Sequence, residues 1–361
     1  MHGGNIYGTK ILHDFSVNIN PMGFPVSLWL RLAFSIGKIK NYPDIECGIL
    51  VKELGKHLGI PCGRIVIGNG ATQIIDAAIQ GCGRKTALCI VPSFTGYRNL
   101  LEKNIFSCET ICLSKNEGFC YSEKILGEIK NRIKNSTPGI VIVANPNNPN
   151  GKVVPLEILH EIEKECLRAG SIFMVDESFI ELTDSPESNS YLPHVNAGSK
   201  TVIVRAFTKT FAIPGVRLGY GICSGEFMVN ELKQKIPEWS VNVLAQIAGT
   251  HCIGKQGYLK KARKIISMEK AYLSKELTSL GFKVYESDGP FILFETDFEF
   301  SLYEKLLSKK VLIRDCSDYE GLDGKFYRVA VKRHNENRIL MKAIREVFKN
   351  EQARIRSSPG Y

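Results

Sequence analysis

The stretch Arg205-Ala-Phe-Thr-Lys-Thr-Phe-Ala-Ile-Pro-Gly-Val-Arg-Leu-Gly-Tyr220 decides the fold, and it follows the apolar run Thr201–Val204 directly. Lys209 therefore lies at the end of a predicted strand, and Arg217 comes eight residues later, after a turn that contains glycine. A lysine amine can form an imine with a carbonyl compound, while an arginine can hold a phosphate. Lys209 alone is also compatible with an ordinary surface lysine, because most of the 47 Lys and Arg residues must be solvated.

A second segment, Ile65-Val-Ile-Gly-Asn-Gly-Ala71, predicts a short strand, a glycine turn and a helix that opens near Ala71. Unpaired amides at a helix start suit a phosphate, so Gly70, Ala71 and the hydroxyl of Thr72 are candidate phosphate ligands. An ordinary strand-to-helix turn, in which Asn69 and Gly70 adopt special dihedral angles, is the alternative interpretation.

Two more apolar runs end in polar residues. Residues 139–144 lead into Asn-Pro-Asn-Asn-Pro, whose prolines stiffen the turn so that Asn148 can be aimed at a ligand. Residues 171–175 lead into Asp176 and Glu177. A carboxylate beside a pyridine nitrogen keeps that nitrogen protonated, and Asp176 is our candidate for this role. The alternative is a carboxylate that caps the strand end or faces solvent, and we expect that of Glu177.

Taken together, these segments resemble fold-type I pyridoxal-phosphate enzymes, in the branch that contains histidinol-phosphate aminotransferases and threonine-phosphate decarboxylases. The resemblance covers nearly the whole chain and implies pyridoxal 5'-phosphate as cofactor. It also implies a homodimer, because Tyr42 in Asn-Tyr-Pro-Asp matches a tyrosine that reaches the cofactor phosphate from a second subunit. The implied contacts are Lys209 as the imine-forming lysine, Asp176 at the pyridine nitrogen, Asn148 at the ring 3-hydroxyl, Phe94 stacked on the ring, and Gly70, Ala71, Thr72, Thr208 and Arg217 at the phosphate.

The two ends of the chain resemble the decarboxylases. The amino-terminal end begins Met1-His-Gly-Gly-Asn5 and continues with Asp14–Gly23, whereas Val311–Leu322 and Phe326–Val331 lie near the other end. Two arginines with fixed donor geometry suit a substrate that bears a phosphate and a carboxylate. The implied substrate residues are His2, Gly3, Gly4, Asn5, Asn20, Asn148, Arg314 and Arg328, of which Arg328 matches the family arginine for the α-carboxylate.

Two positions depart from the pattern of many relatives. Residue 179 is Phe, where aminotransferases of this branch usually have a tyrosine that bonds the ring 3-oxygen, and the decarboxylases tend to have Phe. Residue 206 is Ala, where many relatives place a serine on the cofactor phosphate, so Thr208 and Arg217 must contribute more of that contact.

The predicted function is therefore decarboxylation of L-threonine O-3-phosphate to aminopropanol phosphate for the nucleotide loop of cobalamin, with a phosphoamino acid as the small-molecule substrate. Histidinol-phosphate aminotransferase is one alternative, because both reactions use the same lysine, aspartate and asparagine. Decarboxylation of serine phosphate is another, since the substrates differ by one methyl group, which a pocket discriminates weakly. A non-catalytic, basic binding protein on the same fold is the third.

Composition agrees with this interpretation. The chain has 361 residues, 44% hydrophobic content and a net charge of +10. That charge is also typical of nucleic-acid binding, but the basic residues of 255–275 are interleaved with Glu269 and Glu276, which favours solvated helix faces. The eleven cysteines are scattered without a Cys-x-x-Cys, as expected for free thiols in the cytoplasm. Because the basic residues are expected on solvated faces, we expect no nucleic-acid partner, and we expect no membrane partner because no apolar run has the length needed to span a bilayer.

Apolar runs that alternate with helical periods predict an α/β fold with a mostly parallel sheet. We expect a large cofactor-binding domain over residues 41–254, and a smaller α+β domain formed by residues 1–40 and 255–361, with the substrate between them. The longest predicted loop is 184–200. Predicted strands are 86–91, 109–113, 139–144, 171–175, 201–204, 218–223, 282–285, 291–295, 311–314 and 327–331, and predicted helices are 122–134, 155–169, 240–253, 256–279 and about 335–348.

Overall fold

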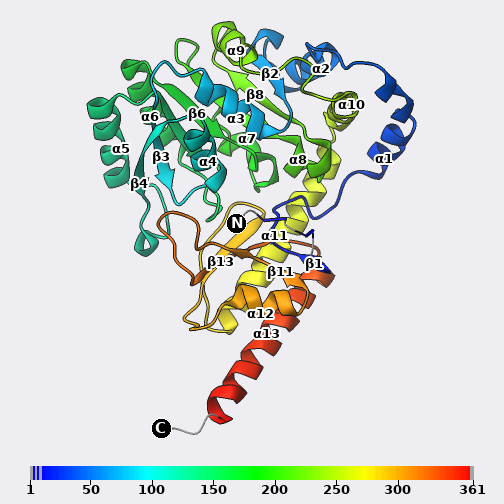
Figure 1. Ribbon diagram of the computed structural model, residues 1–361, viewed down its shortest axis with the longest axis vertical. Helices are drawn as coiled ribbons and strands as arrows, with labels where there is room; N and C mark the ends of the chain where they lie inside the picture. The colour runs from blue at the N-terminus through cyan, green and yellow to red at the C-terminus, as the bar shows by residue number, and fades with distance from the viewer. Residues whose placement is uncertain (1–2, 5, 8–9, 358–361) are drawn as a thin grey trace.

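A seven-stranded sheet forms the larger part of the protein in the computed structural model, which describes residues 3–4, 6–7 and 10–357 (Figure 1). Its strand order is β2-β8-β7-β6-β5-β3-β4. The neighbouring strands from β7 to β4 run parallel, whereas β8 is antiparallel to both β2 and β7. The strands are β2 (Ile65–Gly68), β3 (Thr86–Val91), β4 (Ser107–Cys112), β5 (Ile140–Ala144), β6 (Ile172–Asp176), β7 (Thr201–Ala206) and β8 (Gly219–Cys223).

Helices cover both faces of this sheet, which is why its central strands are apolar along their whole length. Successive side chains of a strand point to opposite faces. Val141 and Val143 therefore share one core with α5 and α6, while Ile140 and Ile142 share the other with α3 and α4. The helices of this part are α2 (Gly48–Leu58), α3 (Ala71–Gln80), α4 (Thr95–Lys103), α5 (Glu123–Ser136), α6 (Leu156–Ala169), α7 (Pro186–Asn189), α8 (Phe207–Thr210), α9 (Glu226–Lys233) and α10 (Val243–Cys252).

A second, four-stranded antiparallel sheet has the order β12-β13-β10-β9 and packs on its own hydrophobic core. The amino-terminal strand β1 pairs in parallel with β11 in a separate two-stranded sheet beside it. We propose that the two larger sheets mark the two domains expected from the sequence. The elements of this part are β1 (His13–Asp14), α11 (Gln256–Ser279), β9 (Lys283–Val284), β10 (Phe291–Glu295), α12 (Leu302–Ser308), β11 (Val311–Leu312), β12 (Arg314–Asp315), β13 (Phe326–Ala330) and α13 (His334–Ser357). Helix α1 (Val26–Ala33) packs against α10 instead, and its Leu28 belongs to a core of the large sheet.

The α/β architecture is confirmed, and three local predictions need correction. The strand predicted over 311–314 is two short strands, because residues 311–312 pair with β1 and residues 314–315 pair with β13. The loop predicted over 184–200 contains helix α7, which begins with Pro186 in its favoured first-turn position. The closing helix extends to Ser357 instead of ending near 348. No helix in the described part of the chain has the length and apolar character needed to cross a bilayer.

Candidate active site

One pocket of about 270 Å³ lies where the ends of several strands of the large sheet face the small sheet. It gathers side chains from positions far apart in the sequence. Twelve of its residues were predicted as site residues, and these are Gly3, Ala71, Thr72, Phe94, Asn148, Asp176, Phe179, Thr208, Lys209, Arg217, Arg314 and Arg328. Ala206 also lines the pocket, at the position where many relatives have a serine.

Lys209 lies in α8, the short helix that follows β7 without a break. Burial lowers the pKa of its amine to about 8, and the nearby Arg328 and Arg217 contribute in the same direction, while Asp176 opposes them. Charged amines are poor nucleophiles, so a lowered pKa makes Lys209 reactive near neutral pH. A buried lysine with these neighbours differs from the solvated lysine that its sequence position also allowed.

Asp176 ends β6 and receives three hydrogen bonds. Tyr97 donates its hydroxyl to Oδ2 at 2.6 Å, and Ser178 donates its amide at 2.9 Å and its hydroxyl at 2.5 Å to Oδ1. Burial raises the pKa of Asp176, and the bonds from Ser178 and Tyr97 counteract part of this rise. Sequence reasoning missed both donors. The spacing Asp-x-Ser, in which a hydroxyl returns to a carboxylate two residues earlier, was a usable signal for Ser178.

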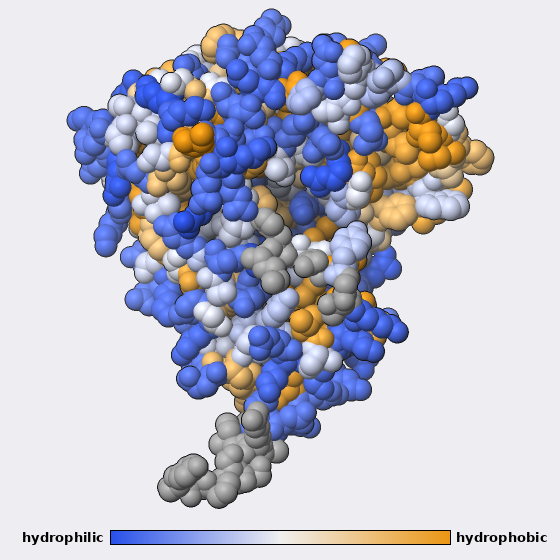
Figure 2. Space-filling model, in the orientation of Figure 1, coloured by the Kyte–Doolittle hydropathy of each residue, from blue (hydrophilic) through white to orange (hydrophobic). Residues whose placement is uncertain are grey.

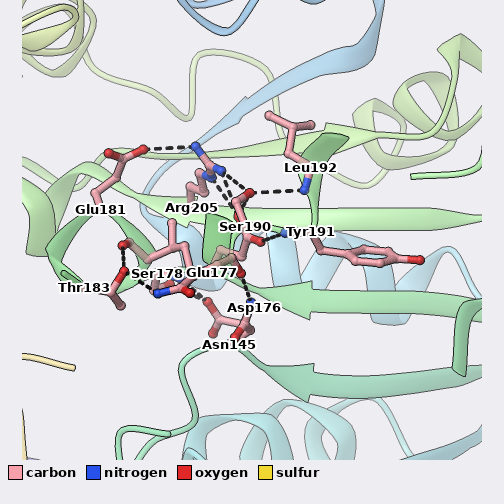
Figure 3. Close-up of polar contacts among 12 residues, drawn as sticks. Asn145, Asp176, Glu177, Ser178, Glu181, Thr183, Ser190, Tyr191, Leu192 and Arg205 are labelled. Atoms are coloured by element: carbon pink, nitrogen blue, oxygen red, sulfur yellow. Dashed lines mark hydrogen bonds and ion pairs between the residues drawn. The ribbon is translucent and has the colours of Figure 1, made fainter. Parts of the chain in front are cut away.

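Glu177 does not line this pocket, although it is the next residue along the chain, and its carboxylate meets Arg205 and Ser190 (Figure 3). Arg205 donates to Glu177 Oε2 at 3.0 and 2.8 Å and to Glu181 at 3.0 Å. Ser190 also donates its hydroxyl to Glu177 Oε2, at 3.0 Å. The expectation that Glu177 caps a strand or faces solvent is wrong, because Glu177 is 1% exposed and paired with Arg205, which is 6% exposed.

The turn before α3 forms a tight cradle with Arg217. Gly70 has φ +81°, and a Cβ built there would lie 2.5 Å from Nη2 of Arg217. A Cβ at Gly219 would lie 2.3 Å from the backbone nitrogen of Ala71. Both glycines are therefore needed for the arginine and the strand to approach the helix start, where partial positive charge accumulates. The predicted site residue Gly70 thus shapes the pocket, although it does not line it.

Arg328 connects the two sheets at the pocket floor. Its guanidinium donates to Asn148 Oδ1, to the Ser16 carbonyl at 2.8 Å and to the Tyr319 hydroxyl oxygen at 3.2 Å. It also lies over the ring of Phe291 at 5.4 Å. Arg328 is 5% exposed, so it is held in place by these contacts rather than by solvent.

Arg314, also 5% exposed, occupies the neighbouring part of the pocket. It donates to both carboxylate oxygens of Asp318, at 2.7 and 2.9 Å, and to the Asp315 carbonyl at 2.7 Å. Its guanidinium stacks 4.9 Å from the ring centre of Tyr319. Sequence reasoning missed Asp318 and Tyr319, whose partners could not be inferred before β12 and β13 were paired.

The remaining predicted residues lie outside the pocket lining of the described chain. Asn20 is buried, and its amide donates to the Thr210 carbonyl at 2.8 Å, so it braces the backbone after Lys209. The Gly4 amide donates to the Ser16 hydroxyl at 2.8 Å. The side chain of Tyr42 is 82% exposed. His2 and Asn5 lie outside the described residues.

Comparisons with known proteins agree with this geometry. Residues 10–344 match the family described as aminotransferase class I and II. The chain is 30% identical to a threonine-phosphate decarboxylase of Salmonella typhimurium, over 96% of each chain. The crystal structure of the histidinol-phosphate aminotransferase from Clostridium acetobutylicum, 31% identical, superposes with a TM-score of 0.86 and covers 94% of this chain and 100% of its own. A Sinorhizobium meliloti histidinol-phosphate aminotransferase in complex with pyridoxal-5'-phosphate, 17% identical, shares the fold with a TM-score of 0.84 and coverage of 94% and 93%.

Proposed function

We propose, from the premise that this chain belongs to the class I and II aminotransferase family and is a pyridoxal-phosphate enzyme, that it decarboxylates L-threonine O-3-phosphate. The predicted fold class, fold-type I, and the predicted cofactor are confirmed by the family match and the structural neighbours. The observation that supports the substrate is the pair of buried arginines, Arg314 and Arg328, in the same pocket as Lys209. The product would be 1-amino-2-propanol O-2-phosphate, a precursor for cobamide synthesis.

The pocket fits the cofactor by the chemistry of its donors and by its shape. We propose that Lys209 attaches pyridoxal phosphate, Asp176 pairs with the pyridine nitrogen, Asn148 bonds the ring oxygen and Phe94 stacks on the ring. We propose that Arg217, Thr208 and residues 70–72 hold its phosphate, in the cradle that a Cβ at Gly70 would fill. When bound, the cofactor withdraws the electron pair that is left at Cα after a bond there breaks.

The two arginines would orient the substrate between them. Arg328 would bind the α-carboxylate and Arg314 the phosphate, each as a charge-assisted, bidentate contact. Holding these two groups at fixed points would decide which bond to Cα is presented for cleavage. In the proposed reaction the carboxylate leaves as carbon dioxide, and a proton is delivered to Cα. Lys209 is the proposed proton donor, because an amine with a pKa near 8 can release and regain a proton near neutral pH.

Phe179 adds support for decarboxylation over transamination. It lines the pocket and packs edge-on against Phe291 at 5.1 Å, where a tyrosine would place a hydroxyl against the cofactor ring oxygen. Histidinol-phosphate aminotransferase is nevertheless a second candidate, favoured by the 31% identity to such an enzyme over its full length. Serine phosphate remains a competing substrate, because one methyl group changes binding by only about 1–3 kcal/mol.

A homodimer is part of the proposal. Large apolar side chains of α1 and the following turn are exposed, including Val26 at 78% and Phe34 at 88%, and Figure 2 shows this apolar area at the upper right. The exposed Tyr42 lies shortly after them and contacts the ring of Trp239 at 5.2 Å. Contiguous apolar surface of this kind is typical of protein interfaces. A second copy would cover it and bring Tyr42 to the neighbouring pocket.

The decisive experiment incubates the holoprotein with O-phospho-L-threonine, O-phospho-L-serine, or histidinol phosphate plus 2-oxoglutarate. Carbon dioxide, the phosphorylated amine and glutamate are quantified in parallel. We expect carbon dioxide and aminopropanol phosphate in equal amounts from O-phosphothreonine, at a higher kcat/KM than for O-phosphoserine. Glutamate formation from histidinol phosphate without release of carbon dioxide in the other two reactions would overturn the proposal in favour of the aminotransferase.

A further inference from the structure

Tyr319 lies between the two arginines and was not singled out by the sequence. It follows β12, is 3% exposed, and lines the pocket. Its ring lies beneath the guanidinium of Arg314 at 4.9 Å, and its hydroxyl oxygen is 3.2 Å from Nη1 of Arg328. Tyr319 therefore contacts both of the arginines to which the proposed function assigns the substrate's two anionic groups.

The direction of the hydrogen bonds fixes what the hydroxyl can do. Arg328 has only N–H donors, so the phenolic oxygen of Tyr319 must accept from it. The phenolic proton then points elsewhere, and the nearest acceptor is Asn148 Oδ1 at 3.4 Å. This long bond is easily exchanged for one to a carboxylate bound at Arg328. Burial raises the pKa of Tyr319, so the hydroxyl stays protonated and remains a donor at neutral pH.

We propose that Tyr319 is a specificity-determining residue that fixes the α-carboxylate on Arg328 through its hydroxyl and the phosphate-binding Arg314 through its ring. This inference rests on the proposed function and deepens it. A carboxylate that accepts from both Arg328 and Tyr319 would keep one orientation in the pocket. That fixed orientation would favour loss of the carboxylate, with a proton returned to Cα, over transamination, in which the Cα proton is lost and water releases a keto acid.

Two substitutions separate the hydroxyl from the ring. Tyr319→Phe keeps the ring beneath Arg314, and we expect kcat/KM for O-phosphothreonine to fall about tenfold, the effect of one lost hydrogen bond to a charged group. The ratio of keto acid to amine among the products should rise by a similar factor. Tyr319→Leu also removes the ring, so the preference for O-phosphothreonine over threonine should fall, whereas Tyr319→Phe should preserve it.

A binding measurement does not depend on turnover. Holoprotein reduced with borohydride cannot react, and calorimetry then gives its affinity for O-phosphothreonine and for inorganic phosphate. We expect Tyr319→Phe to weaken only O-phosphothreonine binding and Tyr319→Leu to weaken both. The matched control is Tyr285→Phe, which also removes a buried hydroxyl, one bonded to Glu295 at 2.8 Å outside the pocket lining of the described chain.

The outcomes are distinguishable. One outcome is that wild-type protein releases carbon dioxide from O-phosphothreonine while Tyr319→Phe leaves the product ratio and the affinity for O-phosphothreonine unchanged. In that case the role of Tyr319 in specificity is rejected and the proposed function stands. The same conclusion follows if Tyr285→Phe changes the product ratio as much as Tyr319→Phe. If wild-type protein neither binds nor decarboxylates O-phosphothreonine, the proposed function and the role of Tyr319 are both rejected.

Discussion

The pocket has two ends that are built in different ways. At the proposed cofactor end, Asn148 follows β5, Asp176 ends β6 and Lys209 follows β7. These three strands are neighbouring and parallel, and Ala144 pairs with Asp176 and Asp176 with Val204. At the proposed substrate end, Arg314 and Arg328 belong to the small sheet and are oriented by side-chain contacts. A rigid backbone ladder places the first group, whereas separate pieces of chain must meet to place the second. Changes at the cofactor end should therefore affect every substrate alike, and changes at the substrate end should discriminate between substrates.

The largest expected effect is that of Lys209→Ala. Removing both the attachment point and the proton donor should lower turnover at least about a thousandfold, for phosphorylated and unphosphorylated substrates alike. The yellow absorbance of the attached cofactor should disappear as well. Absorbance spectra and carbon dioxide release measure the two effects. A variant that keeps both would show that another lysine has this role.

Arg314→Ala should show that the substrate end of the pocket discriminates between phosphorylated and unphosphorylated substrates. Losing a buried, charge-assisted contact should cost about 2–3 kcal/mol, which is on the order of a hundredfold in kcat/KM for O-phosphothreonine. The slow reaction of unphosphorylated threonine should barely change. The comparison variant is Arg328→Ala, which should lower kcat/KM for both substrates. Equal losses for both substrates with Arg314→Ala would remove the main residue-level support for a phosphoamino acid.

The pH dependence of cofactor attachment tests the environment of Lys209. With a pKa of about 8, the amine is increasingly neutral as the pH rises toward 8. The attachment rate for added pyridoxal phosphate should thus rise about tenfold per pH unit below 8 and level off above it. Stopped-flow absorbance on cofactor-free protein measures this rate. A rise that continues to pH 10 would indicate an ordinary, solvated lysine.

How much the sequence could predict differs between the same two regions. A strand end is visible as an apolar run that stops at a polar residue, and parallel strands bring such ends together, so Lys209, Asp176 and Asn148 could be assigned to one pocket. The contact partners of Arg314 and Arg328 could not be predicted in this way, because they depend on which short strands pair. The split of residues 311–315 between two sheets has no signal in the local apolar pattern.

The opposite directions of the Asp176 and Glu177 side chains show a further limit of prediction from the sequence. Side chains alternate across a sheet, which explains why two adjacent carboxylates face different sides, whereas the sequence analysis expected Glu177 to cap the strand or face solvent. The partners of Glu177 on the far side of the sheet could not be predicted from the sequence. Arg205, on the neighbouring strand, pairs with Glu177 in a fully enclosed network with Ser190 (Figure 3). Its position four residues before Lys209 gave no indication that the two point to different faces.

The smallest expected effect concerns a residue that lies away from both ends of the pocket in one chain. Tyr42→Phe removes a single hydroxyl from a side chain that is 82% exposed, so the free energy of unfolding of the isolated chain should change by less than about 0.5 kcal/mol. If a second copy brings this hydroxyl to the cofactor phosphate, cofactor retention should nevertheless weaken about three- to tenfold, as for one lost hydrogen bond. Equilibrium dialysis measures retention, and analytical ultracentrifugation measures the oligomeric state. The matched control is Tyr7→Phe, another exposed tyrosine at 85%, which should change neither. A monomer with full activity would contradict the dimer, whereas a dimer with unchanged retention would leave the shared interface intact and remove Tyr42 from the site.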